Sequence, residues 1–207
     1  MVQRPASSPR ARRTRAALIA AGFELVAERP IDAIPIDDVV SKAGVAKGSF
    51  FNHFADKQDF ANAIAKEVRL DVEALVRAHN AAILDPIERI AGGMKVAVDF
   101  ALTQPSRAIV LLRSQGASTA HNHPLNQGLR RDIEAAMAQN LLRSDARHTG
   151  VLYWLGLCQA LMTHVIEDQL GRDAANRQLA ALLRLGLTGL GAPDTMVDKV
   201  IGRITGS

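Results

Sequence analysis

Apolar residues recur along almost the whole chain at the three- and four-residue spacings of amphipathic helices, and no stretch alternates like a half-buried strand. The first pattern starts at about Arg10 or Thr14 and runs to Glu28. It ends at Arg29-Pro30, because the residue before a proline avoids the helical region. No internal repeat is visible. These patterns predict an all-α fold.

Residues 36–54 predict two short helices that meet at a glycine. Apolar positions of the first helix fall on one face: Ile36, Val39, Val40 and Ala43. The second helix carries Phe50 and Phe54 four residues apart, again on one face. Gly44 can adopt a positive φ, which lets the chain leave the first helix sharply. The pattern is typical of a helix-turn-helix, although an ordinary corner of an all-α protein also fits it.

The outer face of the second helix is small or polar. It consists of Lys47, Gly48, Ser49, Asn52 and His53. Such side chains can lie against a phosphate backbone or a base edge without a clash, and a helix of this kind fits a major groove. This face is therefore the candidate surface for DNA.

The rest of the chain predicts further helices over residues 57–82, 86–104, 106–114, 125–143, 148–170 and 173–190, with a short amphipathic tail after Pro193. Asp56 is placed to cap the first of these, and Asp85-Pro86 reads as a cap and a first-turn proline. Residues 1–9 are expected to be disordered. Residues 115–124 are expected to form a loop.

The helices at 148–170 and 173–190 are apolar over more than one side. A helix of that kind must be buried on more than one side, and a second copy of the chain is the simplest partner. Burial by the C-terminal tail is the alternative. The residues predicted to form a dimer interface are Leu161, Val165, Leu179, Leu182, Leu183 and Leu190.

The segment GVAKGSFFNHFADKQDF resembles the signature of the TetR-type transcriptional repressors. The matching residues are Gly44, Val45, Gly48, Ser49, His53, Phe54 and Lys57, and the resemblance extends from about Thr14 to Phe60. Three residues depart from the family pattern. Ala46 replaces a capping Ser or Thr, Phe51 replaces a Tyr whose hydroxyl commonly reaches a phosphate, and Pro35 lies near the usual Thr cap of the preceding helix.

The resemblance implies a three-helix DNA-binding domain followed by a helical domain for ligand sensing and dimerisation. The expected boundaries are a basic disordered arm at 1–13, the helix-turn-helix domain at 14–57, and the second domain at 58–207. The residues expected to contact DNA are Lys47, Gly48, Ser49, Phe51, Asn52, His53, Lys57, Arg12 and Arg13. The partners implied are a roughly palindromic double-stranded operator, a second copy of the chain and an unknown small molecule.

The family also implies a ligand pocket lined from the central helices. The residues expected there are Met94, Phe100, Arg113, Tyr153, Trp154, Cys158 and Met162, although core packing explains most of them equally well. In the family, the last two core helices form a four-helix dimer interface. The implied function is ligand-responsive repression of transcription. Two alternatives stay open: an all-α carrier or enzyme whose helical corner is incidental, and an architectural DNA-binding dimer without an effector.

The chain of 207 residues has a formal net charge of +4. Residues 1–15 contain Arg4, Arg10, Arg12, Arg13 and Arg15 and no acid, which suits phosphate or minor-groove contact as well as a solubilising terminus. A single cysteine excludes an internal disulfide framework. The start does not resemble a signal peptide, and no apolar run is long enough to span a bilayer, so a cytoplasmic location without membrane association is expected.

Other chemistry is weakly supported. His121 and His123 lack further ligands at the usual spacing, so no metal is expected, and no phosphate loop or other cofactor motif is present. Cys158 and His164 are compatible with a thiol enzyme. However, Cys158 lies in an apolar helix, where a small core residue is the simpler interpretation. The chain is accordingly predicted not to be an enzyme.

Overall fold

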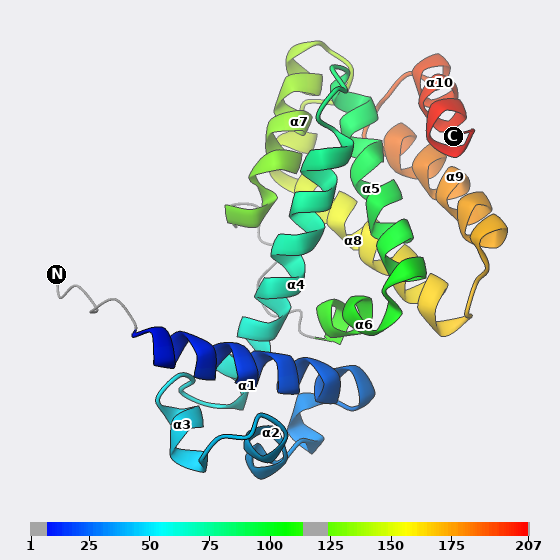
Figure 1. The fold of residues 1–207 in the computed structure, drawn as a ribbon. Helices are drawn as coiled ribbons and strands as arrows, with labels where there is room; N and C mark the ends of the chain where they lie inside the picture. Colours follow the sequence, from blue (N-terminus) through cyan, green and yellow to red (C-terminus); the bar gives the residue numbers. More distant parts are fainter. Residues whose placement is uncertain (1–7, 114–123, 207) are drawn as a thin grey trace, which may run out of the picture. The chain divides into compact units, whose positions relative to one another are not determined.

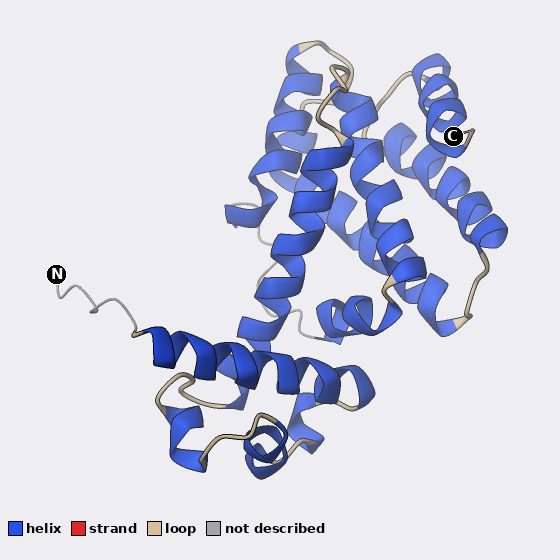
Figure 2. Ribbon diagram, in the orientation of Figure 1, coloured by secondary structure: helices blue, strands red, loops and turns tan. Residues whose placement is uncertain are grey.

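The structure, a computed structural model, describes residues 8–113 and 124–206, and within these ranges every regular element is a helix (Figure 1, Figure 2). The chain forms two compact units, Met1–Val68 and Arg69–Ser207, here called unit 1 and unit 2. The division falls inside helix α4 (Lys57–His79). The all-α prediction is confirmed for the described residues. Of the segment expected to be disordered (1–9), residues 1–7 lie outside them, whereas Pro9 already begins the first helix, so the prediction is wrong there. Residues 115–123 of the expected loop (115–124) also lie outside them.

Unit 1 contains α1 (Pro9–Glu28), the 3-10 turn η1 (Ile31–Ala33), α2 (Ile36–Lys42), α3 (Lys47–Phe51) and the first part of α4. Three phenylalanines form its centre. The ring of Phe60 lies 5.1 Å from that of Phe50 and 4.8 Å from that of Phe54. A methyl group on Gly22 of α1 would lie 2.2 Å from Phe60 Cζ, so the absence of a side chain there lets α1 pack closely on this cluster.

The predicted helix caps are confirmed. Asp56 Oδ1 accepts a hydrogen bond from Asp59 N at 2.8 Å, and Asp85 Oδ1 accepts one from Ile87 N at 2.8 Å. Each bond satisfies an amide that the first turn of a helix leaves unpaired. Helix α3, in contrast, begins after Ala46 without any side-chain cap, as the sequence predicts. Pro35 likewise precedes α2 without a side-chain cap.

Unit 2 continues from α4 into α5 (Pro86–Thr103), α6 (Pro105–Arg113), the 3-10 turn η2 (Pro124–Asn126), α7 (Gln127–Ala138), α8 (Ala146–Glu167), α9 (Arg172–Gly189) and α10 (Asp194–Thr205). Helix α5 packs against α6, α7, α8, α9 and α10. It is correspondingly buried on most of its circumference, with Met94 and Phe100 among its core side chains. Helix α5 therefore forms the centre of unit 2 (Figure 1).

Helices α4, α7 and α8 end at least three residues earlier than expected, α8 at Glu167 instead of about Leu170. Helix α4 ends at His79 instead of about Ala82, and α7 ends at Ala138 instead of about Arg143. In the second case Asn140 adopts a φ of 56°, a left-handed conformation that asparagine tolerates better than most residues. The amide of Leu141 then bonds to Ala136 O at 2.9 Å, which closes the helix end.

Helix α8 corrects the expectation that no apolar segment could span a bilayer. Its 22 residues are long and apolar enough by length and composition alone. The helix packs against α5, α6, α7 and α9, and Trp154, Leu161 and Val165 are buried among them. Its hydrophobicity is therefore accounted for by its place in the core of unit 2.

Helix α10 covers part of α9. Val197, Val200 and Ile204 of α10 are buried, and α10 packs against both α9 and α5. Burial by the C-terminal tail, which the sequence left open, thus accounts for one side of α9.

Candidate nucleic-acid interface and internal pocket

The turn between α2 and α3 depends on Gly44. Its φ of 66° lies in the left-handed region, where a side chain would be strained. The amide of Val45 bonds to Val40 O at 3.0 Å, which closes the end of α2 as the chain reverses. Phe50 is completely buried and fixes the inner face of α3 in the phenylalanine cluster of unit 1. The predicted helix-turn-helix is therefore present, with a regular α3 that is shorter than the predicted segment.

The outer face of α3 is open. Lys47, Gly48 and Asn52 are exposed, while Ser49 and His53 are half-buried. A methyl group on Gly48 would meet nothing within 4 Å, so this backbone position is uncovered by the described residues. Phe51 is 54% exposed, although large apolar side chains usually avoid water. The face thus combines polar groups, a bare backbone position and one uncovered aromatic ring.

The two lysines proposed to meet DNA both reach residues 32–37. Lys47 Nζ lies 2.9 Å from Asp37 Oδ1, and Lys57 Nζ donates to Asp32 O at 3.3 Å. Lys47 therefore lies beside the first turn of α2 and Lys57 beside η1. Arg12 and Arg13 are exposed on α1, and neighbouring Arg15 lies over the Phe54 ring at 5.5 Å and 3.5 Å from Glu67.

A second feature is a pocket of about 640 Å³ inside unit 2. It is lined from α4, α5, α6, α7, α8 and the segment that precedes α7. The apolar lining consists of Val72, Val76, Ile90, Ala97, Leu111, Leu112, Leu125, Leu129, Trp154, Leu155, Cys158 and Met162. This size and lining are typical of small-molecule sites in proteins.

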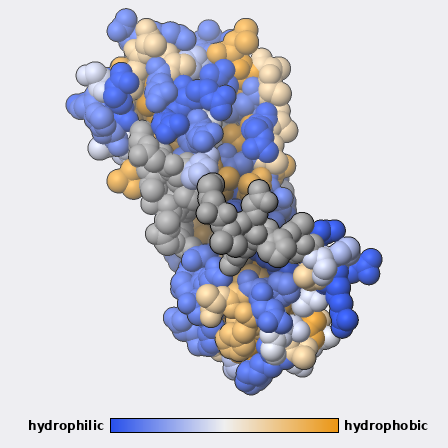
Figure 3. Space-filling view, turned by 90° about the vertical axis from the view of Figure 1, so that its left-hand side faces the viewer, coloured by the Kyte–Doolittle hydropathy of each residue, from blue (hydrophilic) through white to orange (hydrophobic). Residues whose placement is uncertain are grey.

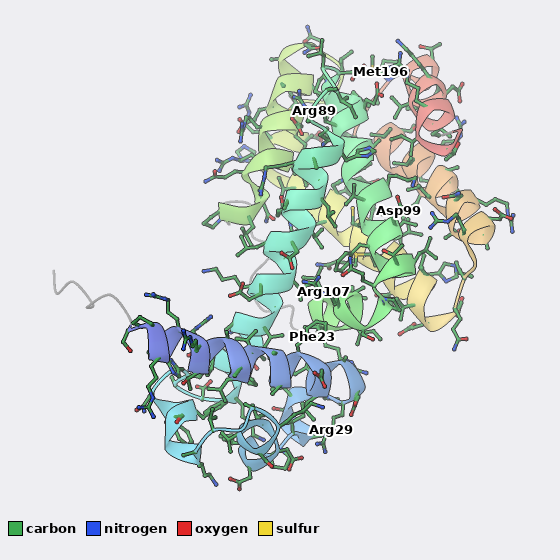
Figure 4. The ribbon with its side chains drawn as sticks, in the orientation of Figure 1. Phe23, Arg29, Arg89, Asp99, Arg107 and Met196 are labelled. Atoms are coloured by element: carbon green, nitrogen blue, oxygen red, sulfur yellow. The ribbon has the colours of Figure 1, made fainter. Side chains whose placement is uncertain are left out.

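The most buried ionic groups of the pocket wall are paired. Arg69 lies 2.7 Å from Glu73 and also donates to Asn126 Oδ1 at 3.0 Å. Arg89, which projects from α5 toward α7 (Figure 4), lies 2.7 Å from Asp132. Burial raises the pKa of Asp132, and Arg89 opposes that shift. The remaining arginines of the lining, Arg77 and Arg131, are exposed.

The pocket lining includes a buried donor without a partner. Trp154 is only 1% exposed, and its indole Nε1 has no hydrogen-bond partner among the residues that the structure describes. Asn80 Oδ1 is also unpaired, but a methyl group on Gly92 would lie 2.5 Å from it, so this oxygen abuts the backbone of α5. Cys158 is buried beside the pocket, and burial raises the pKa of its thiol to about 12.

The residues predicted for a ligand pocket divide into two groups. Trp154, Cys158 and Met162 line the pocket. Met94 and Phe100 are buried in the core without lining it, Arg113 is exposed at the end of α6, and Tyr153 is exposed with its hydroxyl 3.4 Å from Leu185 O. Sequence reasoning missed the charged groups at the wall. Arg69 and Glu73 are four residues apart on one helix, which predicts an ion pair. Arg89 and Asp132 are far apart in the sequence, so no local pattern predicts their pairing.

The residues predicted for a dimer interface lie mostly inside the chain itself. Leu161, Val165, Leu179, Leu183 and Leu190 are buried within unit 2, and Leu182 is half-buried. Their burial therefore requires no second copy. The large apolar side chains that α8 and α9 leave exposed are Leu152, Tyr153 and Leu185.

Other candidate chemistry is absent from the described residues. Among them no group of three or more histidines, cysteines and carboxylates could hold a metal ion, and His121 and His123 lie outside them. Cys158 and His164 do not form a thiolate pair, because the thiol is buried and the His164 ring faces Asp168 at 2.8 Å. On the face shown in Figure 3, hydrophilic side chains predominate over unit 2 and apolar ones occur in small groups.

Comparison with known proteins supports the prediction of a helix-turn-helix. Residues 18–64 match the family model for the bacterial regulatory proteins of the tetR family. A segment of 61 residues is 36% identical to the transcriptional regulator AcuR of Cereibacter sphaeroides. That match covers 30% of this chain and 28% of AcuR, so the chain spans well under two thirds of this relative in sequence.

Solved structures extend the likeness to the whole fold. RolR in complex with resorcinol is 21% identical, with a TM-score of 0.70 over 94% of this chain and 95% of that one. A gamma-butyrolactone receptor (ArpA-like protein) is 20% identical, with a TM-score of 0.60 over 95% of this chain and 98% of that one. A TetR-family regulator from Pectobacterium atrosepticum is 20% identical, with a TM-score of 0.59 over 90% and 94%. At this identity the likeness establishes the fold.

Proposed function

We propose that this chain, whose residues 18–64 form a DNA-binding domain of the bacterial tetR family, is a transcriptional regulator that a small molecule releases from DNA. The observation that carries the proposal is the uncovered outer face of α3. Lys47 and a Gly48 whose added methyl would meet nothing lie on the helix that a helix-turn-helix places in a major groove, and the exposed Asn52 follows directly at its end. The pocket of unit 2 supplies a place for the small molecule.

The roles of the DNA-facing residues follow from their chemistry. Lys47, Lys57, Arg12 and Arg13 would contact phosphates, while Asn52 would read a base edge. Gly48 and Ser49 would let the backbone approach closely, and His53 and Phe51 would contact sugar or phosphate. Because Phe51 lacks a hydroxyl and α3 lacks a side-chain cap, this surface offers fewer backbone contacts than the family pattern.

The proposed regulator is a homodimer that recognises a roughly palindromic operator. Leu152 and Leu185 are 57% and 67% exposed, and a second copy would cover them through the same face of α8 and α9. Compared with the sequence-based assignment, the proposed interface moves from the buried leucines to Leu152, Tyr153 and Leu185. Only Leu182 of the earlier set keeps part of its surface for a partner.

The proposed control is a shift in population. A ligand that binds one spacing of the two recognition helices better than another would draw the dimer away from the DNA-competent state. The related structures with resorcinol and from a gamma-butyrolactone receptor support a small organic effector. We further propose that the protein represses transcription, that it acts by binding and not by catalysis, and that it is cytoplasmic.

The test is an electrophoretic shift of the full chain with the DNA that flanks its own gene. The natural chain should shift this DNA at concentrations that leave random DNA of equal length free. Asn52→Ala should lose this preference, and Lys199→Ala, which changes an exposed lysine of α10, should keep it. Equal binding of both DNAs by the natural chain would favour the alternative of a small-molecule carrier, for which the pocket alone would account.

A further inference from the structure

We propose that the pocket of unit 2 binds a small organic carboxylate, with the apolar body of the ligand inside the pocket and its carboxylate beside Arg77 and Arg131. The inference rests on the proposed function, because it names the class of molecule to which the regulator would respond. The observations that carry it are the excess charge of the pocket lining and the way in which the lining residues are paired.

The pocket lining carries more positive than negative charge. Its cationic side chains are Arg69, Arg77, Arg89 and Arg131, and its anionic ones are Glu73 and Asp132. Over the whole of unit 2, arginines and lysines outnumber carboxylate side chains by the same two. The other charged side chains of unit 2 therefore balance, and the positive excess of this unit lies at the pocket. A cleft lined by charge of one sign attracts a ligand of the opposite charge.

Two of the four arginines are already paired within the wall. Arg69 lies 2.7 Å from Glu73, and Arg89 lies 2.7 Å from Asp132. Both carboxylates are mostly buried, so each needs its arginine to offset the loss of hydration. The two arginines that remain for a ligand are Arg77 and Arg131.

Arg77 lies on the side of α4 that borders the pocket. The lining residues of this helix recur at the spacing of a single helical face, and they are Arg69, Val72, Glu73, Val76, Arg77 and Asn80. Arg77 follows Glu73 by one turn, but the Glu73 carboxylate faces Arg69. On α7, Arg131 is next to Asp132 in the sequence, and that carboxylate faces Arg89. The nearest acid along each helix is thus engaged elsewhere.

Arg77 and Arg131 form no ion pair with a residue that the structure describes. The sequences of segments 1–7 and 114–123 contain neither aspartate nor glutamate, so they add no carboxylate side chain to the balance. Both arginines are exposed. A ligand carboxylate beside them would keep part of its hydration, which avoids most of the cost of burying a charge.

The apolar part of the lining determines the other half of the ligand. Val72, Val76, Ile90 and Leu129 are among the hydrocarbon side chains that border the pocket. An apolar body gains free energy by leaving water for such a surface. The planar guanidinium group matches the two oxygens of a carboxylate better than a point charge does. A molecule with one apolar end and one carboxylate therefore suits both parts of the wall.

Three probes with one apolar body separate the possibilities: 4-cyclohexylbutanoate, 4-cyclohexylbutanamide and 4-cyclohexylbutylammonium. Isothermal titration of the full chain at neutral pH and low salt measures their affinities. The carboxylate should bind about tenfold more tightly than the amide, because two exposed ion pairs contribute about threefold each. The ammonium compound should bind most weakly. Added salt should reduce the advantage of the carboxylate over the amide, because both arginines lie in solvent.

Arg77→Gln and Arg131→Gln provide the matched variants. Each should reduce the advantage of the carboxylate over the amide by about threefold, and the double variant should remove it. Arg177→Gln is the control, because it removes an equal charge from an exposed position of α9, a helix that contributes no residue to the described lining. It should leave the advantage unchanged.

Several outcomes would overturn the proposal. They are an amide that binds the natural chain as tightly as the carboxylate, a preference for the ammonium compound, and no binding by any of the probes. An equal loss in Arg177→Gln would also overturn it, because the effect would then come from the net charge of the chain. If a variant at the pocket fails to fold, the three probes on the natural chain still decide.

These measurements contain no DNA, so they fail independently of the proposed function. A chain that prefers its operator to random DNA but binds carboxylate and amide equally would contradict the ligand class alone. A chain that prefers the carboxylate through Arg77 and Arg131 but shows no preference among DNAs would contradict the regulator and leave the ligand class standing.

Discussion

Lys47 of α3 and Asp37 of α2 form an ion pair of 2.9 Å on the face that the proposal assigns to DNA. Both side chains are mostly exposed, so the pair itself adds little stability. The ion pair should instead affect DNA binding. Asp37 competes with DNA phosphates for the ammonium group of Lys47, and its negative charge repels those phosphates. The acid thus lowers the affinity of the surface on which it lies.

Asp37→Asn should therefore tighten DNA binding, by roughly twofold to fivefold at low salt, the range that a surface ion pair supports. The gain should shrink as salt is added, because the interaction lies in solvent. Fluorescence anisotropy with labelled operator measures the effect. Asp173→Asn in α9 removes an equal charge from unit 2 and should change nothing. Weaker binding by Asp37→Asn would show that Asp37 supports the interface instead of opposing it.

Lys57 and Asn52 should differ in the kind of loss they cause. Lys57→Ala should weaken binding to all sequences about equally and flatten the logarithmic salt slope by roughly one, because one phosphate contact is removed. Asn52→Ala should cost about 1–3 kcal/mol on the preferred site and little on random DNA, because a base contact is removed. Titrations at several salt concentrations separate the two. Unchanged slopes and affinities in both variants would reduce the helix-turn-helix to a structural corner.

Local features of the fold were predictable from the sequence. A helix cap depends only on residues within three positions, so Asp56 and Asp85 predicted where their helices start. The structure confirms both cap hydrogen bonds. The reversal at Gly44 was equally local, since only its own φ and the neighbouring apolar positions decide it. Helix ends were harder, because Asn140 ends α7 through a conformation that its residue type merely permits.

Features that depend on distant contacts were not predictable in this way. Arg89 and Asp132 are 43 residues apart, and only the packing of α5 against α7 brings them together. Periodicity placed Met94 and Trp154 in the core equally, but it could not say which of them borders the pocket. Helix α8 is apolar on most sides, so its sequence does not show which side faces the core. Buried Leu161 and Val165 therefore could not be distinguished from the exposed Leu152.

Leu185→Glu should dissociate the proposed homodimer. Leu185 is 67% exposed in the single chain, so the charge leaves the fold intact, but in a dimer it would be buried without a partner. Sedimentation velocity at micromolar concentration should show a dimer for the natural chain and a monomer for the variant. Leu84→Glu is the control, because Leu84 is 90% exposed and lies in the segment before α5, on neither α8 nor α9. A natural chain that sediments as a monomer would refute the interface.

Cys158 should remain protonated and unreactive at neutral pH. Burial raises the pKa of its thiol to about 12 from an ordinary 9.0. Only the unfolded chain therefore ionises between these values, so the stabilising contribution is complete below pH 9 and is lost as pH rises toward 12. A disulfide reagent at pH 8 should label denatured protein rapidly and native protein slowly. Rapid labelling of the native chain would place the thiol at the surface.

Gly186→Ala should destabilise unit 2 and disturb Trp154. The added methyl would lie 2.9 Å from both Trp154 Cζ3 and Leu157 Cδ1, so at least one of these side chains must move. Overpacking of this kind typically costs about 1–3 kcal/mol. The melting temperature should fall, and the emission of the only tryptophan should shift.

Gly202→Ala in α10 is the matched control, because a methyl there meets nothing within 4 Å. It replaces glycine inside a helix and should raise the free energy of unfolding by about 0.5–1 kcal/mol without affecting Trp154 emission. If both variants gained stability equally, the contact between Gly186 and Trp154 would not exist as described.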